Sequence, residues 1–375
     1  MIAPAAFEDL TFPEQALTYW TKYEFNQWSR AGLNYFNSGS NSGNTAVYST
    51  ASVIHTGLNS IVGGALANNG KMYLGSYGGN AIYSFDTLTD ATPALISSTS
   101  NNCQSVFYSA ITNQAFAVID GNVKVINCSD DSVQNIALTF GGQSIGYGVS
   151  MDGNYAYVNN FFSSNNINRV SLINTGSVAA FSGSFTGDPL KGTMGWDNKM
   201  YMGCGGNGTN GIKVYNPATN TVANLSVPGF GGLSDSYRDI VQHYNGYLYS
   251  FPAYNSGQPI IQIDPTTSTI TNVVTGVTDP RIFSCCVGAD GRVYGIGNGD
   301  AAGYGVSIYN PLTNEYIVES ISATKNWRLI KMGAKGDLYM FNNVGEIWKK
   351  TLLNGGGLQK PLQEYNGIVS RLQNT

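Results

Sequence analysis

The sequence predicts an all-β fold, a seven-bladed β-propeller of four-stranded blades with an N-terminal helical arm. Three observations carry this prediction: the composition, a motif that recurs seven times, and a second set of turns between the copies. Of the 375 residues only 11% are charged, whereas 46 are glycine and 12% are aromatic. Glycine disfavours helix interiors and aromatic residues are enriched in strands, so this composition favours sheets.

The recurring motif is a tight turn followed by an apolar residue and an aromatic one. Four of its copies carry Asn-Gly or Asp-Gly at the turn, which supply the positive φ that short hairpin turns need. The aromatic positions follow one another at intervals of 41–48 residues, the length of one propeller blade. These anchor aromatics are Tyr73, Phe116, Tyr157, Tyr201, Tyr249, Tyr294 and Tyr339.

A second hairpin is predicted within each unit, after the anchor aromatic. Its turns have the pattern Asn/Asp-Pro followed by Thr, beginning at Asn216, Asp264 and Asn310. Proline at the second turn position fixes φ, and the preceding Asn or Asp bonds back to the backbone. Two hairpins make four strands, so each unit has the content of a blade.

The units resemble blades of the YVTN-type propellers. The copy most similar to that pattern is Tyr157-Val158-Asn159-Asn160, and the later Asn-Pro-x-Thr-Asn turns are similar as well. The resemblance implies a propeller. Such propellers serve on surface layers, in adhesion and as enzyme scaffolds, so it implies no single function.

The ring needs a closing strand, because the last unit reaches its glycines at 355–357 after three strands at most. An open propeller would leave unpaired strand edges. We expect residues 46–56 to donate the fourth strand, with residues 367–372 as the alternative. The domain division is therefore an arm and linker over 1–45 and a propeller over 46–375.

Residues 13–36 are predicted to form the helix of the arm, followed by a Gly/Ser/Asn linker over 37–44. One interpretation lays this helix on the propeller's own side. The other docks it into another subunit, since Trp and Tyr dominate interface hot spots. The interface residues in that case are Leu17, Trp20, Tyr23 and Trp28.

Four basic residues stand at corresponding places near the start of the inner strands. Guanidinium groups that converge on the channel of a propeller can clamp a carboxylate or a phosphate. Ion pairs from blade to blade are the alternative, with Asp188, Asp235, Asp239 and Asp279 close by in sequence. The basic residues are Arg238, Arg281 and Arg328, at 11, 13 and 11 residues before their anchors, and Lys191, 10 before its anchor.

Loops after the second strand of each blade share one face with the crossovers between blades. Aromatic side chains beside Asn, Ser and Gly suit sugar stacking or protein contact, although plain loops without a ligand fit the pattern too. The aromatic residues are Tyr77, Phe161, Phe162, Tyr254 and Tyr304.

Composition and motifs exclude several functions. The net charge of −4 and the pI near 5.2 leave no basic field for nucleic acid, and no apolar run is long enough for a membrane helix. With His55 and His243 as the only histidines, no metal site is expected, nor any cofactor. The five cysteines lack C-x-x-C spacing and are expected to be buried. The N-terminus carries no visible signal peptide.

The surface composition looks extracellular, yet no secretion signal accompanies it. A virion protein, made in the host cytoplasm, reconciles the two, and the composition resembles that of tailed-phage appendage proteins. We therefore expect a non-enzymatic structural or receptor-binding virion protein. Its arm would bind other virion subunits and its loop face a host glycan or a neighbouring subunit. The alternative is a carbohydrate-active propeller, a lectin or a glycan hydrolase or lyase, that binds an acidic sugar. An intracellular scaffold with a peptide in its channel is a third possibility.

Overall fold

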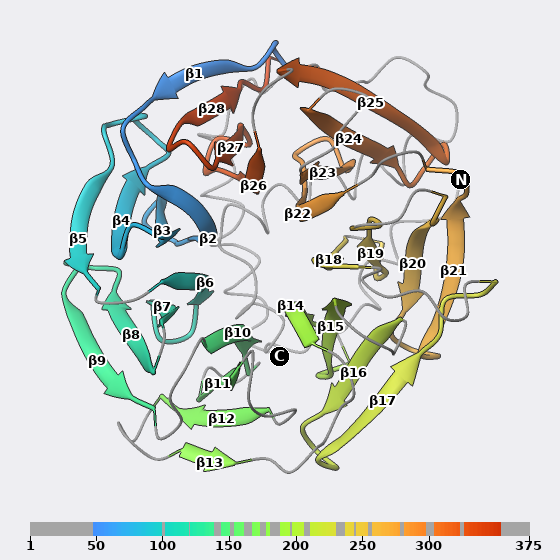
Figure 1. Ribbon diagram of the computed structural model, residues 1–375, viewed down its shortest axis with the longest axis horizontal. Coiled ribbons are helices and arrows are strands. Elements are labelled where there is room, and N and C mark those ends of the chain that lie inside the picture. Colours follow the sequence, from blue (N-terminus) through green and yellow to red (C-terminus); the bar gives the residue numbers. More distant parts are fainter. Residues whose placement is uncertain are drawn as a thin grey trace, which may run out of the picture.

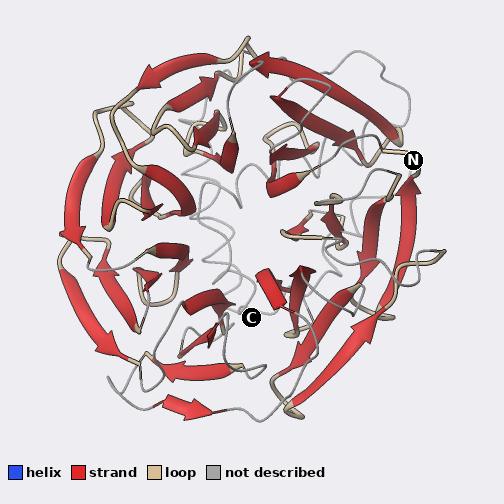
Figure 2. Cartoon of the chain, in the orientation of Figure 1, coloured by secondary structure: helices blue, strands red, loops and turns tan. Residues whose placement is uncertain are grey.

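In the computed structural model, the described residues form seven four-stranded antiparallel sheets around a central axis, as Figure 1 shows. Figure 2 shows strands and loops, without a helix, in this part of the chain. The predicted seven-bladed propeller is confirmed. The predicted arm, with Leu17, Trp20, Tyr23 and Trp28, lies outside the described residues. These are residues 48–353 except 100–101, 120, 139–143, 151–153, 161–166, 173–177, 181–187, 196, 206–210, 230–236, 244, 254–256, 278–280, 298–303 and 323–325.

Each blade runs from an inner strand at the channel to an outer strand at the rim (Figure 1). The inner strands of blades 1 to 7 are β2 (Ser60–Leu66), β6 (Cys103–Ser109), β10 (Ser144–Val149), β14 (Asp188–Met194), β18 (Val241–Gln242), β22 (Ile282–Val287) and β26 (Trp327–Met332). The second strands are β3 (Lys71–Tyr77), β7 (Gln114–Ile119), β11 (Tyr155–Asn160), β15 (Met200–Gly205), β19 (Leu248–Ser250), β23 (Val293–Gly297) and β27 (Leu338–Asn342).

The third and fourth strands complete the blades. The third strands are β4 (Ala81–Asp86), β8 (Asn122–Asn127), β12 (Asn168–Ser171), β16 (Ile212–Asn216), β20 (Ile260–Asp264), β24 (Tyr304–Asn310) and β28 (Ile347–Lys350). The outer strands are β5 (Ala94–Ser98), β9 (Val133–Ala137), β13 (Val178–Ala180), β17 (Thr221–Leu225), β21 (Thr269–Val274), β25 (Glu315–Ser322) and, in blade 7, β1 (Ser52–His55).

All seven anchor aromatics lie on the second strands and are buried. The hairpin turns before them that the structure describes have the expected positive φ, for example 84° at Gly70 and 58° at Asn198. Buried tyrosine hydroxyls need partners, and polar side chains of the turns provide them: Tyr294 donates to Asp290 at 2.6 Å, and Tyr249 accepts from the Asn245 amide at 2.8 Å. The turn of the motif thus forms a hairpin, and its aromatic side chain packs between neighbouring sheets.

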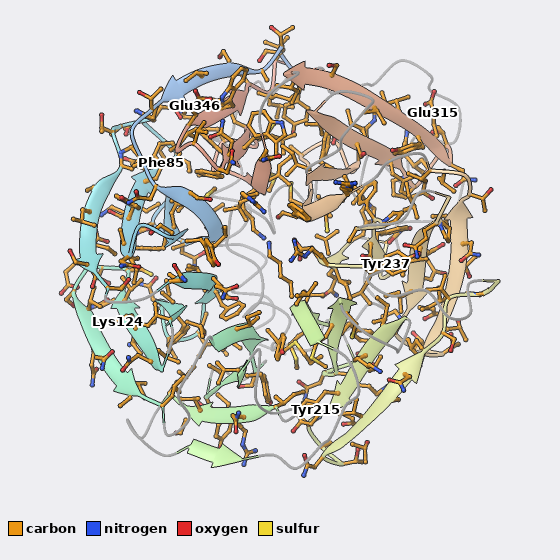
Figure 3. The ribbon with its side chains drawn as sticks, in the orientation of Figure 1. Phe85, Lys124, Tyr215, Tyr237, Glu315 and Glu346 are labelled. Carbon is orange, nitrogen blue, oxygen red and sulfur yellow. The ribbon has the colours of Figure 1, made fainter. Side chains whose placement is uncertain are left out.

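The core lies between the faces of neighbouring blades. At the junction of blades 7 and 1, Leu329 and Phe341 pack with Met72, Leu74 and Phe85. Phe85, labelled in Figure 3, meets the ring of the blade 7 anchor edge-on, with 5.2 Å between centroids. The second strands are covered on both faces in this way: β23 and β27 are buried along their whole length, whereas outer strands such as β5 and β17 are largely exposed.

Ring closure uses the segment that the sequence favoured. β1 pairs with β28, with Ser52 opposite Lys349 and Val53 opposite Trp348. The chain then passes directly into β2 of blade 1. The first described strand therefore completes the last blade, and no strand from 367–372 is needed.

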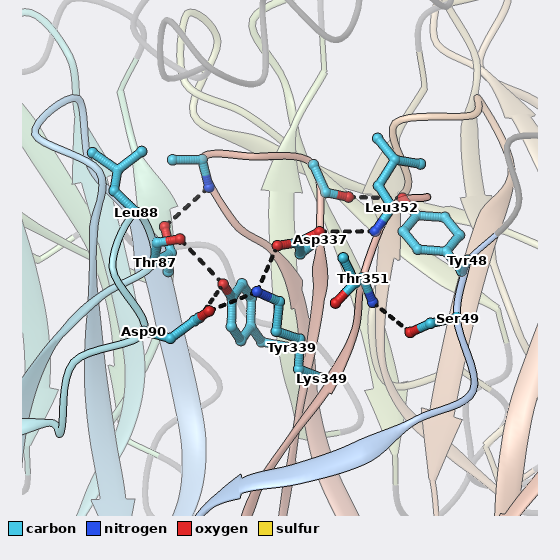
Figure 4. A network of polar contacts seen from close by, with 12 residues as sticks. Tyr48, Ser49, Thr87, Leu88, Asp90, Asp337, Tyr339, Lys349, Thr351 and Leu352 are labelled. Atoms are coloured by element: carbon cyan, nitrogen blue, oxygen red, sulfur yellow. Dashed lines mark hydrogen bonds and ion pairs between the residues drawn. The ribbon is translucent and has the colours of Figure 1, made fainter. Parts of the chain in front are cut away.

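A polar network fastens blade 7 to blade 1 next to this closure (Figure 4). Lys349 Nζ lies 2.6 Å from Asp90 Oδ2 and 2.8 Å from Asp337 Oδ2. Tyr339 donates its hydroxyl to Asp90 Oδ1 at 2.7 Å. Asp90 belongs to the turn between β4 and β5, so one lysine holds carboxylates of both blades. The Asp337 side chain is only 4% exposed, and it depends on this cation.

Replacing Lys349 by methionine, Lys349→Met, should lower the free energy of unfolding by about 3–5 kcal/mol, because it leaves a buried carboxylate unpaired. Denaturant unfolding measures the change. Lys199→Met is the matched control: its ion pair with Asp197 at 2.8 Å is more exposed, and its loss should cost at most about 1 kcal/mol. Equal losses in the two variants would contradict the closing role of Lys349.

The buried His243 makes stability depend on pH. Its Nε2 donates to the carbonyl of Gly291 at 2.7 Å, and burial lowers the pKa of the imidazole from 6.5 to about 4. The unfolded chain takes up a proton at this residue below pH 6.5, whereas the folded chain does so only near 4. The stabilisation is therefore complete above pH 6.5 and is lost as the pH falls toward 4.

For His243 we expect a loss of about 3 kcal/mol between pH 6.5 and 4. The variant His243→Gln should unfold more easily at pH 7 but show a flatter dependence over this interval. Urea unfolding of both proteins at several pH values measures the difference. Parallel curves for the two proteins would show that His243 does not carry the effect.

Candidate functional site

A β-bulge interrupts the pairing of the inner strand with the second strand in six blades of the described chain. A bulge inserts one unpaired residue and re-aims its side chain. Five of these extra residues line one cavity at the mouth of the channel, where the inner strands begin. They are Val62, Gln104, Leu190, Phe283 and Arg328.

The mouth cavity has a volume of about 420 Å³, within the ~300–1,000 Å³ typical of small-molecule sites. Blade 5 contributes Arg238 from the segment just before β18. Tyr77, at the end of β3, stands at the rim and is 45% exposed. Ser60, Gln104 and Ser105 add polar side chains on the opposite part of the wall.

Phe283 brings two arginines together in the mouth cavity. The guanidinium carbon of Arg238 lies 4.5 Å from the ring centroid, and that of Arg328 lies 5.3 Å from it. Cation–π attraction favours both positions and holds the planar groups beside the cavity. The arrangement presents two guanidinium groups, from blades 5 and 7, to one ligand.

Lys191 forms part of the cavity floor. Its Nζ donates to the carbonyl oxygen of Phe283 at 3.2 Å and lies 3.9 Å from Asp239 Oδ2. The amine thus reaches from blade 4 to blade 6. Burial lowers its pKa, Asp239 opposes that change, and the charges of Lys331 and Arg238 add to it.

Below the floor the channel narrows to a cavity of about 80 Å³, lined by Lys191, Asp239 and Lys331 among others. Asp239 is well held, since its Oδ2 accepts the Cys285 N–H at 3.0 Å. A wider basin of about 200 Å³ follows toward the other face. Among the described residues that line these three cavities, four are basic and one is acidic.

A close backbone approach positions Arg238. A Cβ at Gly203 would lie 2.5 Å from the carbonyl oxygen of Tyr237, so only glycine lets this segment rest on β15. Tyr237, labelled in Figure 3, is buried and donates its hydroxyl to the Pro259 carbonyl at 2.8 Å. Both contacts fix the backbone from which the arginine extends.

The structure brings together Lys191, Arg238, Arg328 and Tyr77 of the predicted site. Arg281 is not among the described residues that line the mouth cavity, and Phe283 takes the equivalent place. The spacing in the sequence could have identified Phe283. This residue stands 11 residues before its anchor aromatic, as Arg238 and Arg328 do, whereas Arg281 stands 13 residues before the same anchor. Sequence reasoning missed Phe283, Gln104 and Lys331.

The other predicted residues are distributed as follows. Tyr304 is the first residue of β24, and Phe161, Phe162 and Tyr254 lie outside the described residues. The alternative of ion pairs from blade to blade is represented, within the described part of the chain, by the pair of Lys191 and Asp239. Asp235 and Asp279 also lie outside the described residues.

The histidines and cysteines do not line the mouth cavity. His55 bonds to the Asp90 carbonyl from β1 at the rim, and His243 is buried under the blade 6 turn. All five cysteines are buried, as expected. The described residues contain no cluster of three or more His, Cys, Asp or Glu suited to a metal ion. Within the described part of the chain, no helix is long and apolar enough to cross a membrane.

No protein family model matches the sequence, and a search of curated proteins finds no relative. Solved structures share the architecture. The streptogramin B lyase structure has a TM-score of 0.68 at 13% identity, over 80% of this chain and 97% of that one. Virginiamycin B lyase from Staphylococcus aureus has a TM-score of 0.67 at 14% identity, over 82% of this chain and 100% of that one.

An extracellular domain of a hybrid two component system from B. thetaiotaomicron has a TM-score of 0.61 at 14% identity, over 80% of this chain and 40% of that one. Identities this low establish the fold alone. Since 1341 solved chains match, the architecture itself discriminates poorly between functions.

These likenesses correct the predicted function. The three similar structures are two lyases and the extracellular domain of a hybrid two component system, and none of the three is a virion protein. The expectation of a non-enzymatic virion component is therefore wrong.

The chemistry of the S. aureus lyase does not carry over residue by residue. A variant of that enzyme with one histidine replaced by alanine is catalytically inactive. This chain has two histidines, and neither lines the mouth cavity. Any reaction in the mouth cavity must therefore use side chains other than histidine.

Replacing Asp239 by asparagine should lower the pKa of Lys191 further, because it removes the carboxylate that opposes the effect of burial. The amide oxygen still accepts from the Cys285 N–H, so the fold should survive. NMR titration of ¹³C-dimethylated lysines, with Lys191→Met to assign the signal, measures the shift. An unchanged or higher pKa would contradict the assigned surroundings of Lys191.

Proposed function

We propose that this chain is a carbohydrate-active propeller that binds an acidic sugar at the mouth of its central channel. The observation that carries the proposal is the meeting of Arg238, Arg328 and Lys191 in one cavity of suitable size. The chain has only 19 basic residues and a pI near 5.2, so three in one cavity stand out against its overall charge.

Each part of a carboxylated sugar has a matching group in the mouth cavity. The guanidinium groups beside Phe283 provide paired donors for a carboxylate. Tyr77 at the rim offers an exposed ring for stacking on the apolar face of a sugar, and Ser60, Gln104 and Ser105 suit hydroxyl groups. A phosphate would use the arginines but would leave the aromatic rim without a role.

The likeness of several units to YVTN-type blades remains an expectation within this proposal. It is supported by the Asn-Pro-x-Thr-Asn turns, which form the hairpins between β16 and β17 and between β24 and β25. Because such blades occur with several functions, the likeness does not choose the ligand.

The variant Arg238→Ala, Arg328→Ala should bind trigalacturonate about 10- to 100-fold more weakly per arginine removed, because each lost charged hydrogen bond costs about 1.5–3 kcal/mol. Arg281→Ala is the matched control, with the same residue type outside the cavity lining, and should bind as the wild type does. Isothermal titration calorimetry measures the affinities.

Two further ligands sharpen this experiment. Maltotriose has no carboxylate and should bind much more weakly than trigalacturonate. Inorganic phosphate tests whether charge alone is recognised. Binding of phosphate without trigalacturonate, or an unchanged affinity in the double variant, would overturn the proposal.

A further inference from the structure

The floor of the mouth cavity holds an amine placed to accept a proton. Lys191 lines both the mouth cavity and the narrower cavity beneath it, so it lies below any ligand held by the arginines. Its hydrogen bond to the Phe283 carbonyl orients one N–H. Asp239 Oδ2 forms an ion pair with the amine but, at 3.9 Å, lies too far away for a hydrogen bond.

The charges around Lys191 favour its neutral form. Burial has the largest effect and lowers the pKa of the amine; Lys331 and Arg238 lower it as well, while Asp239 and the Cys285 thiol oppose them. A lowered pKa increases the fraction of neutral amine, whose lone pair a general base requires. The position of Lys191 on the cavity floor and the charges around it therefore both favour the role of a general base.

The carboxylate content of the cavities argues against glycoside hydrolysis. Hydrolases of the common type need two carboxyl groups on either side of the scissile bond. Among the described residues that line the mouth, the narrow cavity and the basin, Asp239 is the only carboxylate. Its Oδ2 already accepts a backbone N–H, and it stands beneath the lysine rather than across from a second acid.

Building on the proposed function, we infer that this cavity is the active site of a lyase: Lys191 acts as the base of a β-elimination that cleaves a 1,4-linked uronic acid chain held by Arg238 and Arg328. The arginines pair with the carboxylate at C5 of the sugar. That pairing neutralises the carboxylate and acidifies the adjacent C–H, which then faces the floor of the cavity.

The bonds and protons balance without a further reactant. The lone pair of Lys191 takes the proton from C5, and the electrons of that C–H bond form the C4=C5 double bond. The C4–O bond to the preceding sugar breaks, and its electron pair leaves with the oxygen. The Lys191 ammonium then returns the proton to that oxygen, so the products are one saturated chain and one with an unsaturated end.

The experiment follows the ultraviolet absorbance of the unsaturated product when the full-length protein is mixed with trigalacturonate. Wild type should produce it. Lys191→Met should lose about 10²–10⁴-fold in kcat, the contribution of a general base, while calorimetry still detects trigalacturonate binding. Lys199→Met, in the same blade but away from the channel, is the control and should keep full activity.

The pH dependence supplies a readout that a structural role for Lys191 would not move. The acidic limb of kcat/KM should report the protonation of Lys191. Asp239→Asn should shift this limb to lower pH, because it removes the opposing carboxylate. Lys331→Met should shift it to higher pH, because it removes a like charge.

The outcomes separate this inference from the binding proposal. Trigalacturonate that binds through the arginines without yielding unsaturated product overturns the lyase inference and leaves binding intact. Cleavage with saturated ends, or full activity in Lys191→Met, also overturns it. Failure of trigalacturonate to bind the wild type overturns both proposals.

Discussion

Closure of the ring is the constraint on which the rest of the structure depends. Seven sheets bury both faces against their neighbours only when the last meets the first, and β1 makes this possible by pairing with β28. The network of Lys349, Asp90 and Asp337 fastens the same junction (Figure 4). Because the ring is closed, the inner strands face a channel of fixed width, and the side chains at its mouth are held by the whole propeller rather than by one loop.

The β-bulges of the inner strands place side chains at the mouth of the channel and so form the candidate site. A regular inner strand would alternate its side chains between the two packed faces of a blade. One extra residue near the start of the strand has no partner in the ladder and is directed to the channel mouth instead. Phe283 and Arg328 both occupy such positions, and Arg238 extends from the equivalent segment of blade 5. Repetition of one backbone irregularity thus collects side chains from distant parts of the sequence.

The sequence revealed the repeat, the buried anchors and the closing segment, because these depend on turn chemistry and hydrophobic pattern. It also placed Lys191, Arg238 and Arg328 at the channel, since their distance from the anchors is nearly constant. Arg281 is not among the described residues that line the mouth cavity, because it stands two residues further from its anchor than Arg238 and Arg328 do and so lies outside the bulge position. Lys331 went unrecognised as a channel residue because inner-strand orientation after a bulge does not follow simple alternation. The predicted function failed because composition reports on the surface, not on the chemistry of a cavity.

The same fold permits quite different chemistry at its centre, and the arrangement of charge decides between the possibilities. The similar lyase depends on a histidine, whereas the two histidines of this chain are bound to backbone carbonyls away from the mouth. Here the proposed base is an amine whose charged form is disfavoured by burial and by Lys331 and Arg238. In the proposed mechanism, the same positive charges attract the sugar carboxylate and favour the neutral form of Lys191. A change that weakens ligand binding is then expected to alter the reaction as well.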